Sequence, residues 1–123
     1  ITTVQKEAAE ATADDVTLLA AIIQCEAGNE VYEGQLAVGA VVMNRVRSGA
    51  YPGTVHDVIY QKSQFPPAAA GTVASIAANG PKQSCIQAAQ EALNGTDNTA
   101  GATCFKRASS GHAGVVIGNH VFY

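Results

Sequence analysis

One glutamate stands where the periodicity of the sequence calls for an apolar residue, and its side chain could do acid–base chemistry. Leu19, Ile22 and Ile23 fall on one face of a predicted helix. Glu26 continues that face, and Gly28 follows at the position of a left-handed helix stop. Burial and the negative end of the helix would both raise the pKa of the Glu26 carboxyl. The spacing therefore predicts a general acid that keeps its proton near neutral pH.

The same residues allow a plainer interpretation, in which the helix ends one turn earlier and Glu26 is solvated. Two further acids, Glu30 and Glu33, lie at the start of the next helical segment. Both could simply meet the positive end of that helix. Glu33 could instead orient the site or brace the junction between the two helices.

Other common kinds of catalytic site find little support in the sequence. The histidines at positions 56, 112 and 120 lack the spacing of metal ligands, so neither a metal nor a cofactor is expected. A nucleophilic pair of Cys25 and His120 is conceivable. However, Cys25 and Glu26 are neighbours on a helix and point roughly 100° apart, and a nearby carboxylate disfavours the thiolate.

The elements that must position Glu26 are mostly helices. Asp14 or Asp15 would cap the helix that carries it. A second helix, from about 31 to 46 and capped by Asn29 or Glu30, is apolar nearly all round and should be the buried central helix. Glycines within that helix, at positions 34 and 39, indicate a close approach of another backbone.

Two shorter helices are predicted further along the chain. Thr54 would cap the first, over 55–60, and Pro81 would occupy the first position of the second, which ends at 94–95. Between them, residues 61–80 lack both helical and strand periodicity. They predict a long connection, which in a compact domain is usually functional or disordered.

The C-terminal part has strand character. Residues 102–106 could form a strand, and residues 115–117 and 120–122 predict a hairpin with a two-residue turn. His120 and Phe122 would then share one face. The expected fold class is mainly α (α+β), a helical domain with a small β element near the C-terminus.

Composition limits what the chain can be. Its 123 residues are 47% hydrophobic and 14% charged, which is typical of one globular domain. The net charge of −3 argues against a nucleic-acid partner, and no apolar run is long enough to span a membrane. The chain opens with Ile1, so we expect that an N-terminal targeting segment has been removed. Residues 1–13 are interpreted as a tail or linker end and residues 14–123 as the domain.

The three cysteines leave two alternatives open. Cys85 and Cys104 are the favoured disulfide, which would close a loop of about 20 residues and contribute roughly 3 kcal/mol. Cys25, on a helix, would then be a buried thiol. The alternative is three reduced cysteines in a reducing compartment.

Two motifs resemble those of the SleB/CwlJ-type spore-cortex-lytic cell-wall hydrolases. The first comprises CEAGNE at 25–30 and YEGQLAVGAVVMNRV at 32–46, and the second is IGNHVF at 117–122. Shorter similarities fall at 51–55, 58–61, 64–65 and 88–95. The resemblance therefore covers roughly residues 15–123.

This resemblance implies a lysozyme-like, goose-lysozyme-related fold that acts on peptidoglycan glycan strands, in a secreted protein or one of the cell envelope or spore. Glu26 matches the first glutamate of the family's Glu-Ala-x-x-Glu motif, the catalytic acid of a lytic transglycosylase. Such enzymes cut the MurNAc–GlcNAc β-1,4 bond and leave a 1,6-anhydro ring. One carboxyl suffices for this reaction, whereas most glycosidases use a pair.

The resemblance also implies residues that bind the glycan. Gln64 and Phe65 would contact it near the acid, on a wall formed by the 61–80 connection. Phe105, His120 and Phe122 would form the opposite wall, although each could equally be packed in the core.

The sequence departs from the family in two places. Residues 28 and 29 are Gly and Asn where many relatives carry Arg-Gly, and Phe105 is the one aromatic residue of a strand that is often aromatic-rich. These departures affect the residues expected to bind the sugars of the glycan, whereas the catalytic acid Glu26 is unchanged. The alternatives are a hydrolytic muramidase, an amidase, a glycan-binding module without turnover, or a purely structural domain.

Overall fold

The computed structural model describes residues 3–123, with side chains from residue 14 onward. Its helices are α1 (Thr3–Ala27), α2 (Tyr32–Ser48), α3 (Val55–Ile59), α4 (Pro66–Ala69), α5 (Thr72–Asn79) and α6 (Gln83–Leu93). Its strands are β1 (Phe105–Arg107), β2 (Val115–Ile117) and β3 (His120–Phe122), with a short 3-10 helix, η1 (Ala108–Ser110), after β1. The expected mainly helical domain with a small C-terminal β element is confirmed.

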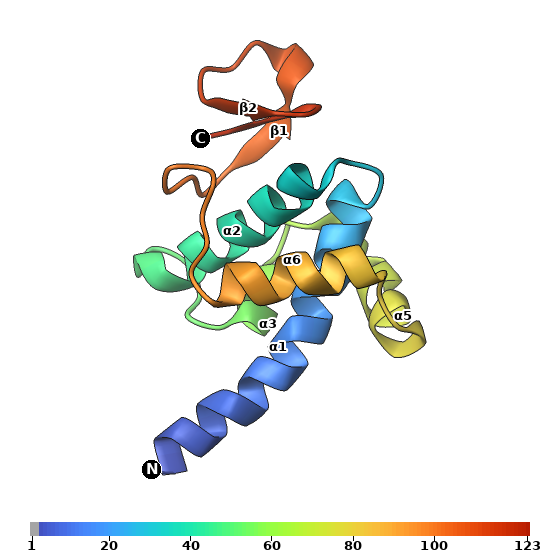
Figure 1. Cartoon of the computed structure of the whole chain (residues 1–123), viewed down its shortest axis with the longest axis vertical. Coiled ribbons are helices and arrows are strands. Elements are labelled where there is room, and N and C mark those ends of the chain that lie inside the picture. Colours follow the sequence, from blue (N-terminus) through green and yellow to red (C-terminus); the bar gives the residue numbers. More distant parts are fainter. Residues whose placement is uncertain (1–2) are drawn as a thin grey trace.

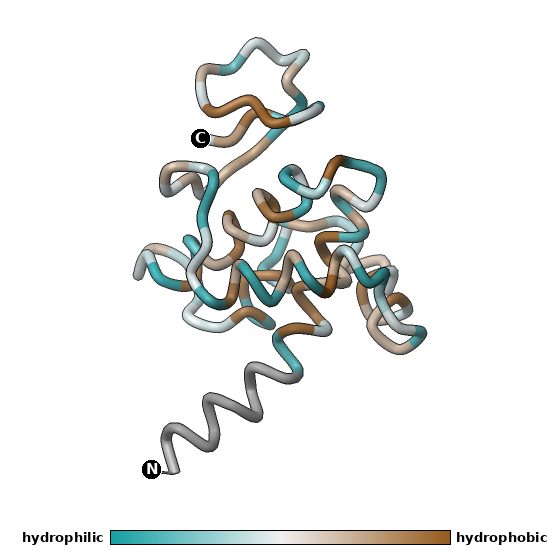
Figure 2. The backbone as a smooth tube through the Cα atoms, viewed as in Figure 1, coloured by the Kyte–Doolittle hydropathy of each residue, from teal (hydrophilic) through white to brown (hydrophobic). Residues whose placement is uncertain are grey.

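Helices α1, α2 and α6 pack on one another and form the body of the molecule (Figure 1). Figure 2 shows hydrophobic residues along the parts of α1 and α2 that lie inside this body, whereas α6 alternates between hydrophilic and hydrophobic residues. The core contains Leu19, Ile22 and Ile23 of α1, together with nearly every residue of α2 from 34 to 43. The prediction that the second helix is the buried central one is therefore confirmed.

Gly39 shows how closely these helices approach. A Cβ atom at this position would lie 3.0 Å from the Cβ of Ala92 on α6 and 3.0 Å from Cδ1 of Ile23 on α1. The predicted close packing at Gly39 is thus correct. Gly34 has a different neighbour, because a Cβ there would lie 3.1 Å from the Cβ of Glu30.

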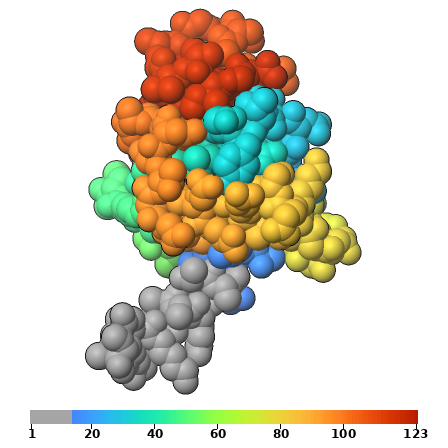
Figure 3. Space-filling model, viewed as in Figure 1, coloured from blue at the N-terminus to red at the C-terminus, as the bar shows by residue number. Residues whose placement is uncertain are grey.

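The three strands form one antiparallel sheet in the order β1-β3-β2. In Figure 3 this C-terminal part (red) lies against α2 (teal), and α6 (orange to yellow) lies on the other side of α2. The predicted hairpin is confirmed, with Gly118 in the left-handed region at φ +57°. The first strand begins at Phe105 rather than at Ala102.

Several predicted helix ends are wrong. Asp14 and Asp15 lie within α1 rather than capping it, because the helix already begins at Thr3. The predicted tail overlaps this helix, and its side chains fall outside the described residues. The residue before α2 is Val31, whose side chain makes no capping hydrogen bond, so neither Asn29 nor Glu30 caps that helix.

Two other predicted helix starts have different outcomes. The Thr54 cap is confirmed, since its Oγ1 accepts a 3.1 Å hydrogen bond from the backbone N–H of Asp57. Pro81, by contrast, lies two residues before the first residue of α6, which is Gln83.

The predicted connection over residues 61–80 contains two helices, so the expectation of a structureless segment is wrong. Pro66 begins α4, and α5 carries Val73, which is fully buried, and the half-buried Ile76. Only these two large apolar residues mark the buried face of α5. Alanines supply most of its helix propensity, and they leave the hydrophobic periodicity weak.

A polar cluster shapes the connection that leads from α6 to β1. Asn44 Nδ2 donates to the carbonyl oxygen of Ala102 at 2.9 Å and to Oδ2 of Asp97 at 3.2 Å. The same Asp97 carboxylate accepts hydrogen bonds from the backbone N–H groups of Thr99 and Gly101, both at 2.8 Å. These contacts fix residues 97–102 against α2 and so direct the following strand past the end of α1.

Cys85 and Cys104 are free thiols, so the predicted disulfide is not formed. Cys85 is buried in the core on α6, whereas Cys104 is half-buried just before β1. The packing of α6 therefore holds Cys85 without a covalent link. Within residues 3–123, no helix combines the length and hydrophobicity needed to span a bilayer.

Candidate active site

Glu26 lies in the last turn of α1 and lines a groove of about 270 Å³. We call this hollow the Glu26 groove. Its lining residues come from α1, α2, the segment before α4, β1 and the C-terminus, and they are Glu26, Arg45, Gln64, Phe65, Cys104, Phe105 and Tyr123. The end of the first helix, the 61–80 segment and the β element therefore meet around one acid.

Burial raises the pKa of the Glu26 carboxyl. The side chain is half-buried, so the solvated alternative is wrong. Among the side chains that the structure describes, none forms a hydrogen bond with this carboxyl. A desolvated carboxyl that opens onto a groove can hold a proton and deliver it to a bound ligand.

Gly28 ends α1, but not by the predicted left-handed conformation. Its φ is not positive. Its backbone N–H donates to the carbonyl oxygen of Gln24 at 3.0 Å, and a Cβ at Gly28 would lie 2.5 Å from that oxygen. The absence of a side chain thus allows the tight turn that follows Glu26.

Arg45 is one of three residues of this groove that the sequence analysis does not assign to the site, together with Cys104 and Tyr123. Its side chain is buried, with 6% exposed. Nε donates to the carbonyl oxygen of Thr103 at 2.7 Å, and a terminal guanidinium nitrogen donates to Oε1 of Gln64 at 3.1 Å. The guanidinium also lies over the rings of Tyr51 and Phe65, 4.8 and 5.4 Å from their centroids. Arg45 therefore holds Gln64 in place at the groove.

A basic residue in the last turn of a helix is ordinarily explained by the helix dipole, so its position alone does not indicate a role for Arg45 in the site. The signal that could have revealed it is periodicity. Arg45 follows Val38 by seven residues and Val41 by four, so it lies on a buried face of α2. Cys104 and Tyr123, also in the groove, had no such signal.

The structure brings together four of the predicted site residues, namely Glu26, Gln64, Phe65 and Phe105. Phe122 is not among them, because it is 1% exposed and belongs to the core. The prediction that Phe122 forms a groove wall is wrong, since its side chain belongs to the core cluster formed with the helices. Glu33 is exposed on α2 and does not line the groove, and its backbone carbonyl accepts a hydrogen bond from Asn98.

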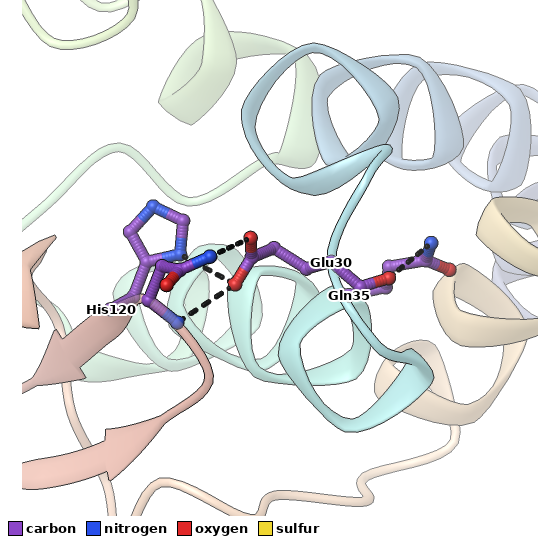
Figure 4. A network of polar contacts seen from close by, with 4 residues as sticks. Glu30, Gln35 and His120 are labelled. Atoms are coloured by element: carbon purple, nitrogen blue, oxygen red, sulfur yellow. Dashed lines mark hydrogen bonds and ion pairs between the residues drawn. The ribbon is translucent and has the colours of Figure 1, made fainter.

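Glu30 links the two motifs of the sequence (Figure 4). Its two carboxylate oxygens accept 2.9 Å hydrogen bonds from the backbone N–H and from Nδ2 of Asn119 in the hairpin turn. His120 Nδ1 lies 3.8 Å from Oε1, and Gln35 Nε2 donates to the Glu30 backbone carbonyl at 3.3 Å. The backbone hydrogen bond from Asn119, followed by its side-chain bond, holds the pKa of Glu30 below its usual value.

Glu26 is therefore the one acidic side chain that lines the groove among the described residues. In the same part of the chain, no group of three His, Cys, Asp or Glu side chains is placed to hold a metal ion. Burial, and then the nearby Glu26, raise the pKa of the Cys25 thiol, which disfavours the nucleophilic thiolate. His120 lies beside Glu30 and not in the Glu26 groove.

A mainly helical domain whose open groove combines one half-buried acid with aromatic side chains is suited, as a class, to acid–base chemistry on a bound ligand. The chain belongs to the cell wall hydrolase family. The sequence model of this family, described as Cell Wall Hydrolase, matches residues 29–123.

Relatives and solved structures support the same family. The spore cortex-lytic enzyme of Halalkalibacterium halodurans is 32% identical over 117 residues, which cover 89% of this chain and 34% of that protein. The enzyme of the same name from Bacillus subtilis is 36% identical over 84 residues, covering 68% of this chain and 26% of that protein. The chain thus spans about a third or less of the length of these two curated relatives.

Two solved catalytic domains have the same fold. The catalytic domain of the germination-specific lytic transglycosylase SleB from Bacillus anthracis aligns with a TM-score of 0.77 and 30% identity, covering 89% of this chain and 93% of that one. The catalytic domain of the Bacillus cereus SleB protein aligns with a TM-score of 0.76 and 31% identity, covering 89% of each chain. The resemblance seen in the sequence motifs is therefore confirmed for the family and the fold.

Proposed function

We propose that this domain is a lytic transglycosylase that cleaves the MurNAc–GlcNAc β-1,4 bond of peptidoglycan, with Glu26 as its catalytic acid and base. The observation that carries the proposal is the Glu26 groove. A single carboxyl side chain with a raised pKa opens into it, and no second acidic side chain accompanies it among the described lining residues. Most glycosidases need two carboxyl groups on opposite sides of the bond they cut.

The proposed reaction uses the one carboxyl twice. Glu26 gives its proton to the glycosidic oxygen, and the bond between that oxygen and the muramoyl C1 breaks. The resulting carboxylate then takes the proton of the 6-hydroxyl of the same muramoyl residue, and its O6 bonds to C1. This closes a 1,6-anhydro ring, returns the proton to Glu26 and consumes no water.

The residues around Glu26 are suited to binding sugars. Gln64 offers an amide to sugar hydroxyls, and its hydrogen bond to Arg45 fixes the direction of that amide. Phe105 is half-buried and supplies apolar surface against which the face of a sugar ring can pack, whereas Phe65 is 5% exposed and its ring carries the Arg45 guanidinium. His120 lies outside this groove and has no place in the bond-cleaving step.

The substrate that we propose is the peptidoglycan of the cell envelope or the spore, outside the cytoplasm. The relatives named spore cortex-lytic enzymes and the fold shared with a germination-specific lytic transglycosylase support this proposal. The composition also suits it, since the net charge of −3 offers little attraction to nucleic acid.

The proposal is tested by digesting purified peptidoglycan and identifying the soluble fragments by mass. We expect the wild type to release fragments with anhydro ends, and Glu26→Gln to be slower by about 10²-fold or more. Asp14→Asn, which makes the same acid-to-amide change at an exposed position of α1, should match the wild type. Fragments one water heavier would indicate a muramidase, and free peptide stems an amidase. Binding to the glycan without release of any fragment would indicate a binding module.

A further inference from the structure

A second pocket, of about 330 Å³, lies beside the hairpin. Residues from the α1–α2 junction, β1, η1 and the hairpin line it, and they are Glu30, Arg107, Ala108, Ser109, Asn119 and His120. We call it the Arg107 pocket. The proposed reaction at Glu26 makes no use of it.

The sheet connects the Arg107 pocket to the Glu26 groove. Side chains alternate along a strand, so Phe105 and Arg107 share one face of β1 while Lys106 points to the other. Arg107 is opposite His120 in the strand register, and the His120 ring meets Phe105 edge to face at a centroid distance of 5.4 Å. Phe105 lines the Glu26 groove, so this row of three side chains leads from the catalytic acid to Arg107.

The charges of the pocket leave one group available to a ligand. Both oxygens of Glu30 already accept hydrogen bonds from Asn119. Arg107 is exposed, and its guanidinium has no hydrogen bond or ion pair with any side chain that the structure describes. The exposed Ser109 adds a hydroxyl to the same pocket. A guanidinium binds a carboxylate through two parallel hydrogen bonds, which makes it selective for such a group.

We propose that the Arg107 pocket binds a carboxylate carried by the glycan strand that is cut at Glu26. This inference rests on the proposed function. Muramoyl residues carry a lactyl ether with a carboxyl group, which is either free or extended by a peptide with carboxylates of its own. N-acetylglucosamine residues carry neither the lactyl carboxyl nor a peptide. Binding at Arg107 therefore sets the register of the strand, so that the bond at C1 of a muramoyl residue lies at Glu26 rather than the alternate bond.

The test compares Arg107→Gln with Lys106→Gln, which removes the same charge from the next residue but on the opposite face of β1. Each protein is given native walls and walls whose carboxyls have been converted to neutral amides with carbodiimide and methylamine. When native walls are supplied at a concentration too low to saturate the enzyme, we expect Arg107→Gln to release fragments about tenfold more slowly than the wild type. Lys106→Gln should equal the wild type. On amidated walls, all three proteins should have the same rate.

A further arm identifies the carboxylate. Walls stripped of their peptides by an amidase keep only the free lactyl carboxyl. If Arg107→Gln is still tenfold slower on these walls, the pocket binds the lactyl group, and if the difference vanishes, it binds the peptide. Equal rates for Arg107→Gln and Lys106→Gln on native walls would overturn the proposal, as would an undiminished difference on amidated walls.

Co-sedimentation with the same walls keeps this result separate from the proposed function. Binding is measured in the Glu26→Gln background, where no cleavage is needed. We expect Arg107→Gln to weaken binding to native walls and not to amidated walls. If the wild type cut no bond and this pattern still held, the proposed function would fail and the carboxylate site would stand. If Arg107→Gln weakened binding equally to native and amidated walls, the proposed carboxylate site would be wrong.

Discussion

At the scale of single residues, the environment of Glu26 decides its chemistry. The carboxyl is half-buried at the end of α1, and burial raises its pKa. None of the described side chains around it forms a hydrogen bond or ion pair with it. Arg45 shares the groove, but its guanidinium is bound to Thr103 and Gln64 and stacked on two aromatic rings. The groove thus combines a carboxyl whose pKa is raised by burial with a cation that is already hydrogen-bonded and stacked.

The raised pKa of Glu26 predicts the pH dependence of the reaction. The active form is the protonated carboxyl, so kcat/KM should fall as the pH rises through the Glu26 pKa. The pH at which kcat/KM begins to fall should lie above 4.5, the ordinary pKa of a glutamate. Initial rates measured across a pH series would show it. A rate that rises with pH over the same range would mean that Glu26 is needed as a carboxylate from the start.

Thermal unfolding of Glu26→Gln tests the raised pKa of Glu26 independently of catalysis. A carboxyl whose pKa is raised by folding favours the folded state below its unfolded pKa. That contribution is lost as the pH rises through the folded pKa. The Gln variant carries no charge, so it should gain stability relative to the wild type as the pH rises. A stability difference that stays constant with pH would show that the Glu26 pKa is not raised.

The buried position of Arg45 leads to a second prediction at this scale. Arg45→Lys keeps the charge but loses the planar group that bonds Thr103 and Gln64 and stacks on Tyr51 and Phe65. We expect it to lower the free energy of unfolding by about 1–3 kcal/mol. Arg47→Lys, at an exposed position of the same helical turn, should have little effect. Urea unfolding measures both, and equal losses would contradict the proposed role of Arg45.

At the scale of elements, Glu30 holds the hairpin against the junction of α1 and α2. Its carboxylate reaches Asn119, which lies 89 positions further along the chain. This contact joins the two segments whose motifs resemble those of the family. Because β3 also pairs with β1, the same contact helps to hold Phe105 at the groove of Glu26.

Gly118 allows Glu30 to come this close. A Cβ at Gly118 would lie 2.7 Å from the Glu30 Oε1 atom, whereas one at Gly49 would meet no atom within 4 Å. Both glycines have positive φ. Gly49→Ala should therefore cost about 1 kcal/mol of backbone strain. Gly118→Ala should lower the free energy of unfolding by the same backbone strain and by about 1–2 kcal/mol in addition, because it displaces a charge-assisted hydrogen bond. Denaturant unfolding at neutral pH measures the difference.

The excess cost at Gly118 should also depend on pH. The folded pKa of Glu30 is lowered, so its stabilising effect is present above the ordinary pKa and is lost as the pH falls through the folded value. The two alanine variants should become alike in acid. An excess that did not change with pH would indicate a steric cost alone.

At the scale of the whole molecule, the sequence predicted those elements whose signal is local and strong. The apolar stripe of α1, the nearly continuous apolar run of α2 and the two-residue turn of the hairpin each specify their own structure. Glu26 was found in the same way, as a polar residue that interrupts an apolar face.

What the sequence could not predict depends on contacts between distant segments. The alanine-rich α4 and α5 carry few large apolar residues to mark a buried face. The interior position of Phe122 and the surface position of Glu33 follow from how the sheet and α2 are packed, and the spacing of residues does not reveal this. The arrangement of Arg45 between Tyr51 and Phe65 likewise arises only when three separate segments meet.

Running the reaction in water enriched in oxygen-18 tests the central claim most directly. If the single carboxyl of Glu26 serves as both acid and base, the muramoyl 6-hydroxyl attacks C1 and no water enters the product. The new ends of the glycan should then carry no oxygen-18, and they should have the anhydro mass. Incorporation of one oxygen-18 atom at each new reducing end would show that water attacks instead, and it would contradict the transglycosylase account.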